Sequence, residues 1–159
     1  MRQELAQLGN GAHALAIQIL GNREDAADAV HDAFTTALAR PEAYDSDRGP
    51  LKPWFLRVVR NRCIDLLRRR RPTGVDAALL ADPGARPDER LEVAERDRGL
   101  QRALSRLKPE QRQIVVLRDY LDLSYAEIAA VLDVAPGTVM SRLHRSRVAL
   151  KAELENGHD

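Results

Sequence analysis

Residues 72–89 are rich in proline and glycine and separate two stretches with strong helical patterns. On both sides of this segment, apolar residues recur every three or four positions, which is the spacing of one face of an α-helix. The segment itself has little periodicity, and proline and glycine disfavour the interior of helices and strands. The sequence therefore predicts two helical parts joined by a linker, with the domain boundary at residues 72–89.

The composition also favours packed helices over sheets. Hydrophobic residues make up 44% of the 159 residues, but aromatic residues make up only 4%. A core must then consist mainly of Leu, Ala, Val and Ile, whereas strands are enriched in β-branched and aromatic residues. We predict an all-α fold of two small helical domains joined by a flexible linker.

Helix boundaries can be placed from caps and breakers. Asn22 can cap a helix that Pro41 ends, because an asparagine side chain accepts from free N–H groups and proline cannot continue a helix. The apolar periodicity predicts helices over the following ranges: 12–20, 23–40, 53–70, 90–107 and 110–120.

Residues 124–147 have the pattern of a short helix, a turn and a longer helix. Ser124 precedes Glu127 by three residues, which is a capping box for a helix over residues 125–132. After a turn of three residues (133–135), Pro136 can open the last helix, because proline is favoured in the first helical turn. This is the helix-turn-helix arrangement, in which the second helix presents one face to the major groove of DNA.

Cations gather in this last predicted helix. Val139 and Leu143 are four residues apart and should face inward, so the intervening positions point largely outward. The outward positions are Met140, Ser141, His144, Arg145 and Arg147. Arginine can read guanine edges or hold phosphates, and Thr138 and Ser141 can donate to phosphates near the helix N-terminus. The alternative is a basic helix that is simply solvated, and whose cations are stabilised by the helix dipole.

The net charge of +1 conceals separate charged segments. Residues 22–47 are mainly acidic, and residues 57–71 hold seven arginines against a single acid. Residues 136–151 contain four cations and no acid. Solvated helix faces usually mix both signs, so this segregation indicates separate surfaces for separate partners.

Several classes of protein are disfavoured. The single cysteine, Cys63, cannot form an internal disulfide, and the sequence around it has no Cys/His cluster that could complete a zinc site. We therefore expect it to pack in the core. We find no signal peptide and no run of about 20 apolar residues, which predicts a soluble cytoplasmic protein. The chain has no glycine-rich phosphate loop or nucleophile motif, so we expect neither catalysis nor a cofactor.

Two parts of the sequence resemble bacterial sigma factors of the extracytoplasmic-function (ECF) group of the sigma-70 family. "LSYAEIAAVLDVAPGTVMSRLHRSRVALK" (123–151) resembles the fourth domain of these factors. "GNREDAADAVHDAFTTALAR" (21–40) and "PWFLRVVRNRCIDLLRRRR" (53–71) resemble the second domain. The two parts occur in the order of the family, joined by a variable linker, and together they cover most of the chain.

The resemblance implies a division into sigma region 2 (1–71), a linker (72–89) and sigma region 4 (90–155). It implies binding to core RNA polymerase, through the β′ clamp helices and the β flap, to promoter DNA and to an anti-sigma factor. The implied polymerase-binding residues are Asp25, Asp28, Asp32 and Phe34. The implied −10 residues are Arg57, Arg60, Asn61, Arg62, Arg68 and Arg69. The implied −35 residues are Thr138, Met140, Ser141, Arg142, His144, Arg145 and Arg147.

The chain departs from the family pattern at a few positions. The family usually has Lys or Arg in place of Met140 and often a capping Ser in place of Ala135. Residues 1–12, with Gly9 and Gly11, match the first helix of the family poorly. Two alternatives therefore stay open: a DNA-binding regulator that never joins polymerase, and a degenerate sigma-like decoy.

Overall fold

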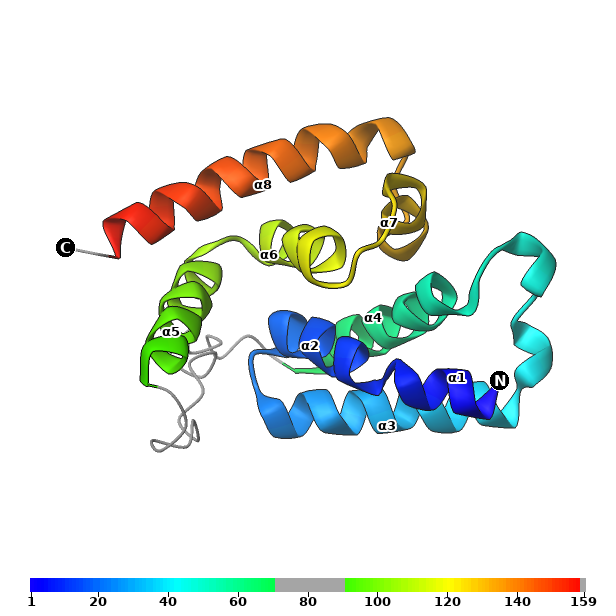
Figure 1. Cartoon of the computed structure of the whole chain (residues 1–159). Helices are drawn as coiled ribbons and strands as arrows, with labels where there is room; N and C mark the ends of the chain where they lie inside the picture. The colour runs from blue at the N-terminus through cyan, green and yellow to red at the C-terminus, as the bar shows by residue number, and fades with distance from the viewer. Residues whose placement is uncertain (71–90, 158–159) are drawn as a thin grey trace.

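The computed structural model describes residues 1–70 and 91–157, and side chains in the second range from residue 98 onward. Every regular element in these ranges is helical, which confirms the predicted all-α fold of two helical domains (Figure 1). The predicted linker, residues 72–89, lies outside the described residues. The first domain contains α1 (Arg2–Gln7), α2 (Gly9–Leu20), α3 (Arg23–Ala39), η1 (Pro41–Ala43), η2 (Ser46–Arg48) and α4 (Leu51–Arg69). The second contains α5 (Leu91–Arg106), α6 (Pro109–Val115), η4 (Val116–Tyr120), α7 (Tyr125–Leu132) and α8 (Pro136–Asn156).

In the first domain, α2, α3 and α4 pack against one another around an aliphatic core. Leu15, Phe55 and Val59 are completely buried at its centre. The rings of Phe34 and Phe55 lie 4.8 Å apart between centroids and join α3 to α4. A pair of aromatic rings therefore completes a core that aliphatic residues otherwise fill.

The N-terminal segment is helical despite its two glycines. Leu5 of α1 is buried, and α2 begins at Gly9. A Cβ atom at Gly11 would lie 2.8 Å from Cδ2 of Leu121, a residue of the second domain. Glycine at this position thus lets the second domain approach the backbone of α2 closely.

Helix starts follow the capping signals in the sequence. The side chain of Asn22 accepts a hydrogen bond of 3.1 Å from the backbone N–H of Asp25, as predicted. At α7, Ser124 Oγ accepts from the N–H of Glu127 at 3.1 Å, and Glu127 Oε1 accepts from the N–H of Ser124 at 2.9 Å. Asp133 ends α7 in the left-handed conformation (φ 57°). The predicted helix 125–132 is confirmed.

The helix predicted over residues 110–120 is regular only in its first part. From Val116 to Tyr120 the chain forms a π-helix, in which the N–H of Leu121 bonds to the carbonyl of Val116 at 2.9 Å. This wider turn allows Leu117, Leu121 and Leu123 all to be buried. An uninterrupted α-helix would keep Leu117 and Leu121 on one face but would turn Leu123 away from it.

The second domain packs α8 across α5, α6 and α7, and it also contacts the first domain. Helix α7 lies against α4, and α6 lies against α2, so the two domains share one continuous apolar core. In Figure 1, α8 is the outermost helix of the second domain, on the side away from α2 and α4. This arrangement leaves one face of α8 open.

Candidate nucleic-acid interface

Helix α8 has the amphipathic arrangement that the sequence predicted. Val139 and Leu143 are 0% and 1% exposed, and they pack into the core beside α7. Thr138 is half-buried at the edge of the opposite face. The remaining predicted −35 residues are all exposed: Met140, Ser141, Arg142, His144, Arg145 and Arg147. The structure therefore brings most of these side chains together on the open surface of one helix.

Local hydrogen bonds hold the polar groups of this surface against the helix. Ser141 Oγ donates to the carbonyl of Thr138 at 3.1 Å, and Arg145 Nε lies 3.4 Å from the carbonyl of Ser141. A guanidinium has five N–H donors, so one backbone bond leaves further donors of Arg145 for a ligand. This surface offers both hydroxyl and guanidinium donors, which suit phosphate and base edges.

Arg147 differs from the other predicted −35 residues because it pairs with a carboxylate on another element. Its Nε donates to Oδ2 of Asp119 at 3.1 Å, and its Nη2 donates to Oδ1 of the same carboxylate. These hydrogen bonds raise the pKa of Arg147. The sequence analysis did not identify Asp119, which stands 28 positions away and has no local pattern that links it to α8.

A second cation is fixed close by, at the start of α7. Arg118 lies 4.9 Å from the ring centroid of Tyr125 and donates to the carbonyl of Leu123 at 2.8 Å. The guanidinium thus closes the π-helical segment onto the first helix of the helix-turn-helix.

Helix α4 carries a second group of predicted DNA-binding residues. Arg57, Asn61 and Arg68 are exposed and recur at four-and-seven spacing, so they share one open face. Arg69, at the end of the helix, is also exposed. The other two predicted −10 residues, Arg60 and Arg62, are half-buried at the flanks and engaged within the protein.

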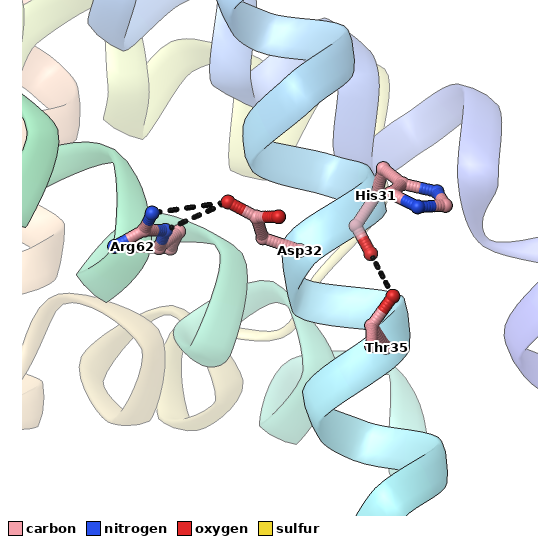
Figure 2. Close-up of polar contacts among 4 residues, drawn as sticks. All are labelled: His31, Asp32, Thr35 and Arg62. Atoms are coloured by element: carbon pink, nitrogen blue, oxygen red, sulfur yellow. Dashed lines mark hydrogen bonds and ion pairs between the residues drawn. The ribbon is translucent and has the colours of Figure 1, made fainter.

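Arg62 connects the two groups predicted for the first domain. Its Nε and Nη2 atoms donate to Oδ2 of Asp32 at 3.2 and 3.0 Å (Figure 2). In this view Asp32 points toward α4, whereas Thr35 bonds to the carbonyl of His31 along α3 at 3.0 Å. A predicted polymerase-binding acid and a predicted −10 cation therefore neutralise each other in this arrangement.

The other acids predicted to bind polymerase have different environments. Asp25 pairs with Arg70 at 2.6 Å, and this hydrogen-bonded cation lowers the pKa of Asp25. Asp28 is exposed on the surface of α3. Phe34 is half-buried against Phe55, so it supports the core as well as the predicted interface.

Three cations join the two domains, and we call this group of contacts the interdomain seam. Arg60 Nε of α4 donates to Oε1 of Gln113 at 3.0 Å, and burial lowers the pKa of Arg60. The seam further contains hydrogen bonds from Arg112 Nε to the carbonyl of Gln18 at 2.8 Å and from Lys52 Nζ to the carbonyl of Leu121. One predicted −10 residue thus takes part in holding the domains together.

Cys63 is buried in the first domain, and burial raises the pKa of its thiol to about 12. This fits the packing role predicted for it. Across residues 1–70 and 91–157, the helices include none long and apolar enough to cross a membrane.

A helix-turn-helix with a cationic outer face is an architecture of DNA-binding proteins. Comparison with known families gives a narrower class. Residues 5–73 match the family "Sigma-70 region 2", and residues 97–150 match "Sigma-70, region 4". The chain belongs to the ECF sigma factors of the sigma-70 family.

Individual relatives agree with this assignment. The chain is 38% identical over 142 residues to the ECF RNA polymerase sigma factor SigM of Mycobacterium tuberculosis, across 87% of this chain and 68% of SigM. It is 34% identical to the ECF RNA polymerase sigma factor SigE of Mycolicibacterium smegmatis, across 91% of this chain but only 58% of SigE. The solved structure of CnrH in complex with the cytosolic domain of CnrY is similar, with a TM-score of 0.69 and 28% identity over 97% of this chain and 86% of CnrH.

Proposed function

We propose that this protein binds core RNA polymerase, recognises the −35 and −10 elements of promoters and promotes initiation of transcription. The observation that carries the proposal is the combination of two surfaces in one chain. A helix-turn-helix with an open cationic face follows an arginine-rich helix beside an acidic one. The proposed parts are region 2 (1–71), the linker (72–89) and region 4 (90–155).

Region 4 would bind the −35 element as duplex DNA. Helix α8 enters the major groove by its first turns, while α7 crosses the phosphate backbone. Arg145 reads a base edge or holds a phosphate, and Ser141 and His144 contact neighbouring groups on the same face. The remaining members of the proposed surface are Thr138, Met140, Arg142 and Arg147.

Region 2 would hold the displaced single strand of the −10 element. The open face of Arg57, Asn61 and Arg68 offers phosphate contacts on both sides of an amide that can bond to a base. Arg69 extends this face toward the end of α4. Arg62 joins it once it leaves Asp32, because an arginine in a partly exposed ion pair can exchange partners at low cost. Arg60 joins it when the interdomain seam opens and separates it from Gln113.

The acidic helix α3 would dock on the β′ clamp helices. Asp28 would offer a charge that is unpaired among the described residues, with Asp25, Asp32 and Phe34 beside it. Region 4 would contact the β flap. An anti-sigma factor would act on the free protein. The similar structure of CnrH was solved in complex with a protein partner, the cytosolic domain of CnrY. The protein would act in the cytoplasm, and the chemistry would belong to the polymerase.

Contact with two separate promoter elements would require the interdomain seam to open. The seam adds polar contacts to the apolar core that the two domains share, and both would have to separate. Gln18 adds an imperfect contact, because its Oε1 is buried without a hydrogen-bond partner among the described residues. Binding to polymerase and DNA would supply the free energy for this separation.

Run-off transcription with purified bacterial core polymerase and this protein, on the DNA upstream of its own gene, tests the proposal. We expect a discrete start site that depends on the protein. The variant Arg145→Ala should weaken protection of the −35 element at least tenfold, and the matched control Arg102→Ala, on the exposed surface of α5, should not. Binding to core without a transcript would identify a sigma-like decoy. Absence of core binding would identify a DNA-binding regulator.

A further inference from the structure

Met140 is an apolar side chain in the middle of the proposed −35 surface. It is 61% exposed, although most of the exposed positions around it are polar or charged. A large exposed apolar side chain gains free energy when a partner covers it, whereas a hydroxyl or guanidinium at the same place would already be well solvated. The question is which chemical group on DNA could cover it.

The position of Met140 along α8 places it where a recognition helix meets bases. It stands four residues after Pro136, or about 6 Å along the axis at 1.5 Å per residue. The first turns of such a helix enter the groove. Gly137 lies three residues before Met140. A Cβ atom at Gly137 would have no neighbour within 4 Å among the described residues, so DNA can approach the helix backbone closely at this point.

The other large exposed apolar residue of α8 does not share this position. Val148 is 55% exposed, but it lies twelve residues after Pro136, about 18 Å along the axis. At that distance the helix has passed the edge of the groove. Val148 is therefore a matched control for Met140.

Thymine supplies the apolar group that the major groove offers, its C5-methyl. A methionine thioether is flexible and polarisable and carries no hydrogen-bond donor, so it fits a methyl group better than a phosphate. We propose that Met140 reads the C5-methyl group of a thymine within the −35 element, and so makes this factor prefer thymine at that position. The inference rests on the proposed function and specifies its DNA sequence.

The cations beside Met140 support this role. Arg147 is bound to Asp119, so one charge fewer on this face is free for phosphates. Apolar contact therefore carries a larger share of recognition here than on a surface with many free arginines. Substitution Met140→Arg should add one phosphate contact and steepen the dependence of log affinity on log salt by about one unit.

Deoxyuridine differs from thymidine only in lacking the methyl group, and this makes the test direct. Holoenzyme assembled from core polymerase and this protein is bound to its promoter, with each −35 thymine on either strand replaced in turn by deoxyuridine. At one position we expect affinity to fall about fourfold, the equivalent of about 0.8 kcal/mol for one buried apolar carbon. Met140→Ala should abolish that difference, and Val148→Ala should keep it.

The inference is overturned if no replacement changes affinity, or if Met140→Ala stays as sensitive as the unaltered protein. This outcome can be separated from failure of the proposed function. If only the inference fails, the holoenzyme forms and Arg145→Ala weakens −35 protection, while deoxyuridine has no effect or its effect does not depend on Met140. If the proposed function fails, the protein does not join core polymerase or leaves the −35 element unprotected.

Discussion

Replacement of Arg112 by methionine tests the packing of the two domains most directly. Arg112 is only 7% exposed, and its Nε donates to the carbonyl of Gln18 at 2.8 Å. This carbonyl belongs to the last turn of α2, where carbonyl groups have no partner within their own helix. Nη1 of Arg112 also donates to the carbonyl of Leu107 at 3.1 Å. One guanidinium therefore caps α2 from the other domain.

The free-energy cost follows from these two hydrogen bonds. A hydrogen bond to a charged group contributes about 1.5–3 kcal/mol. Methionine would leave the carbonyls of Gln18 and Leu107 without the hydrogen bonds that Arg112 donates. Burial lowers the pKa of Arg112, because the cation is poorly solvated, and removal of this penalty offsets part of the loss. Methionine retains most of the stem volume, so the cavity is small. We expect a net loss of about 2 kcal/mol, or roughly 4–8 °C in Tm.

Urea unfolding followed by circular dichroism measures this loss. The control is Arg102→Met, which removes an exposed arginine from α5 and should change stability by less than about 0.5 kcal/mol. Equal losses in the two variants would refute the capping role of Arg112. Since the seam opens in the proposed promoter complex, Arg112→Met should also keep its transcription activity at 25 °C.

Three further predictions concern single elements. Ser124→Ala removes half of the capping box with Glu127 and should cost about 1 kcal/mol in urea unfolding. Cys63 should react with a thiol reagent at pH 8 only after denaturant is added, because its thiol has a pKa of about 12 in the folded protein. Asp25→Asn should lower stability by less than about 1 kcal/mol at pH 7, because the pair with Arg70 is partly exposed. The folded pKa of Asp25 is lowered, so this stabilisation is present above the unfolded pKa and should fade as the pH falls below about 4.

Much of the local structure was predictable because its causes lie within a few residues. The bonds that start α7 join Ser124 and Glu127, three positions apart, and Asn22 caps α3 over the same separation. The inward positions of α8, Val139 and Leu143, follow from the helical period alone. The open face of α8 could therefore be listed residue by residue before its neighbours were known.

Long-range partners could not be predicted in this way. Gly11 looked unfavourable for a helix, yet its lack of a side chain admits Leu121 from the other domain. The π-helical turn before Leu121 likewise depends on how the apolar residues meet the core. The few residues around Gly11 and around the π-helical turn contain no pattern that indicates these long-range contacts.

The sequence by itself determined most of the helices, the caps at Asn22 and Ser124 and the helix-turn-helix, because hydrogen bonds and apolar periods within one helix depend only on nearby residues. Only the tertiary structure decided which cations are free. Arg147 is engaged by an acid 28 positions away, Arg60 by an amide 53 positions away, and Arg112 by a carbonyl 94 positions away. Such pairs arise when packing of apolar faces brings distant helices together, and the charge of a residue does not reveal which partner packing will give it.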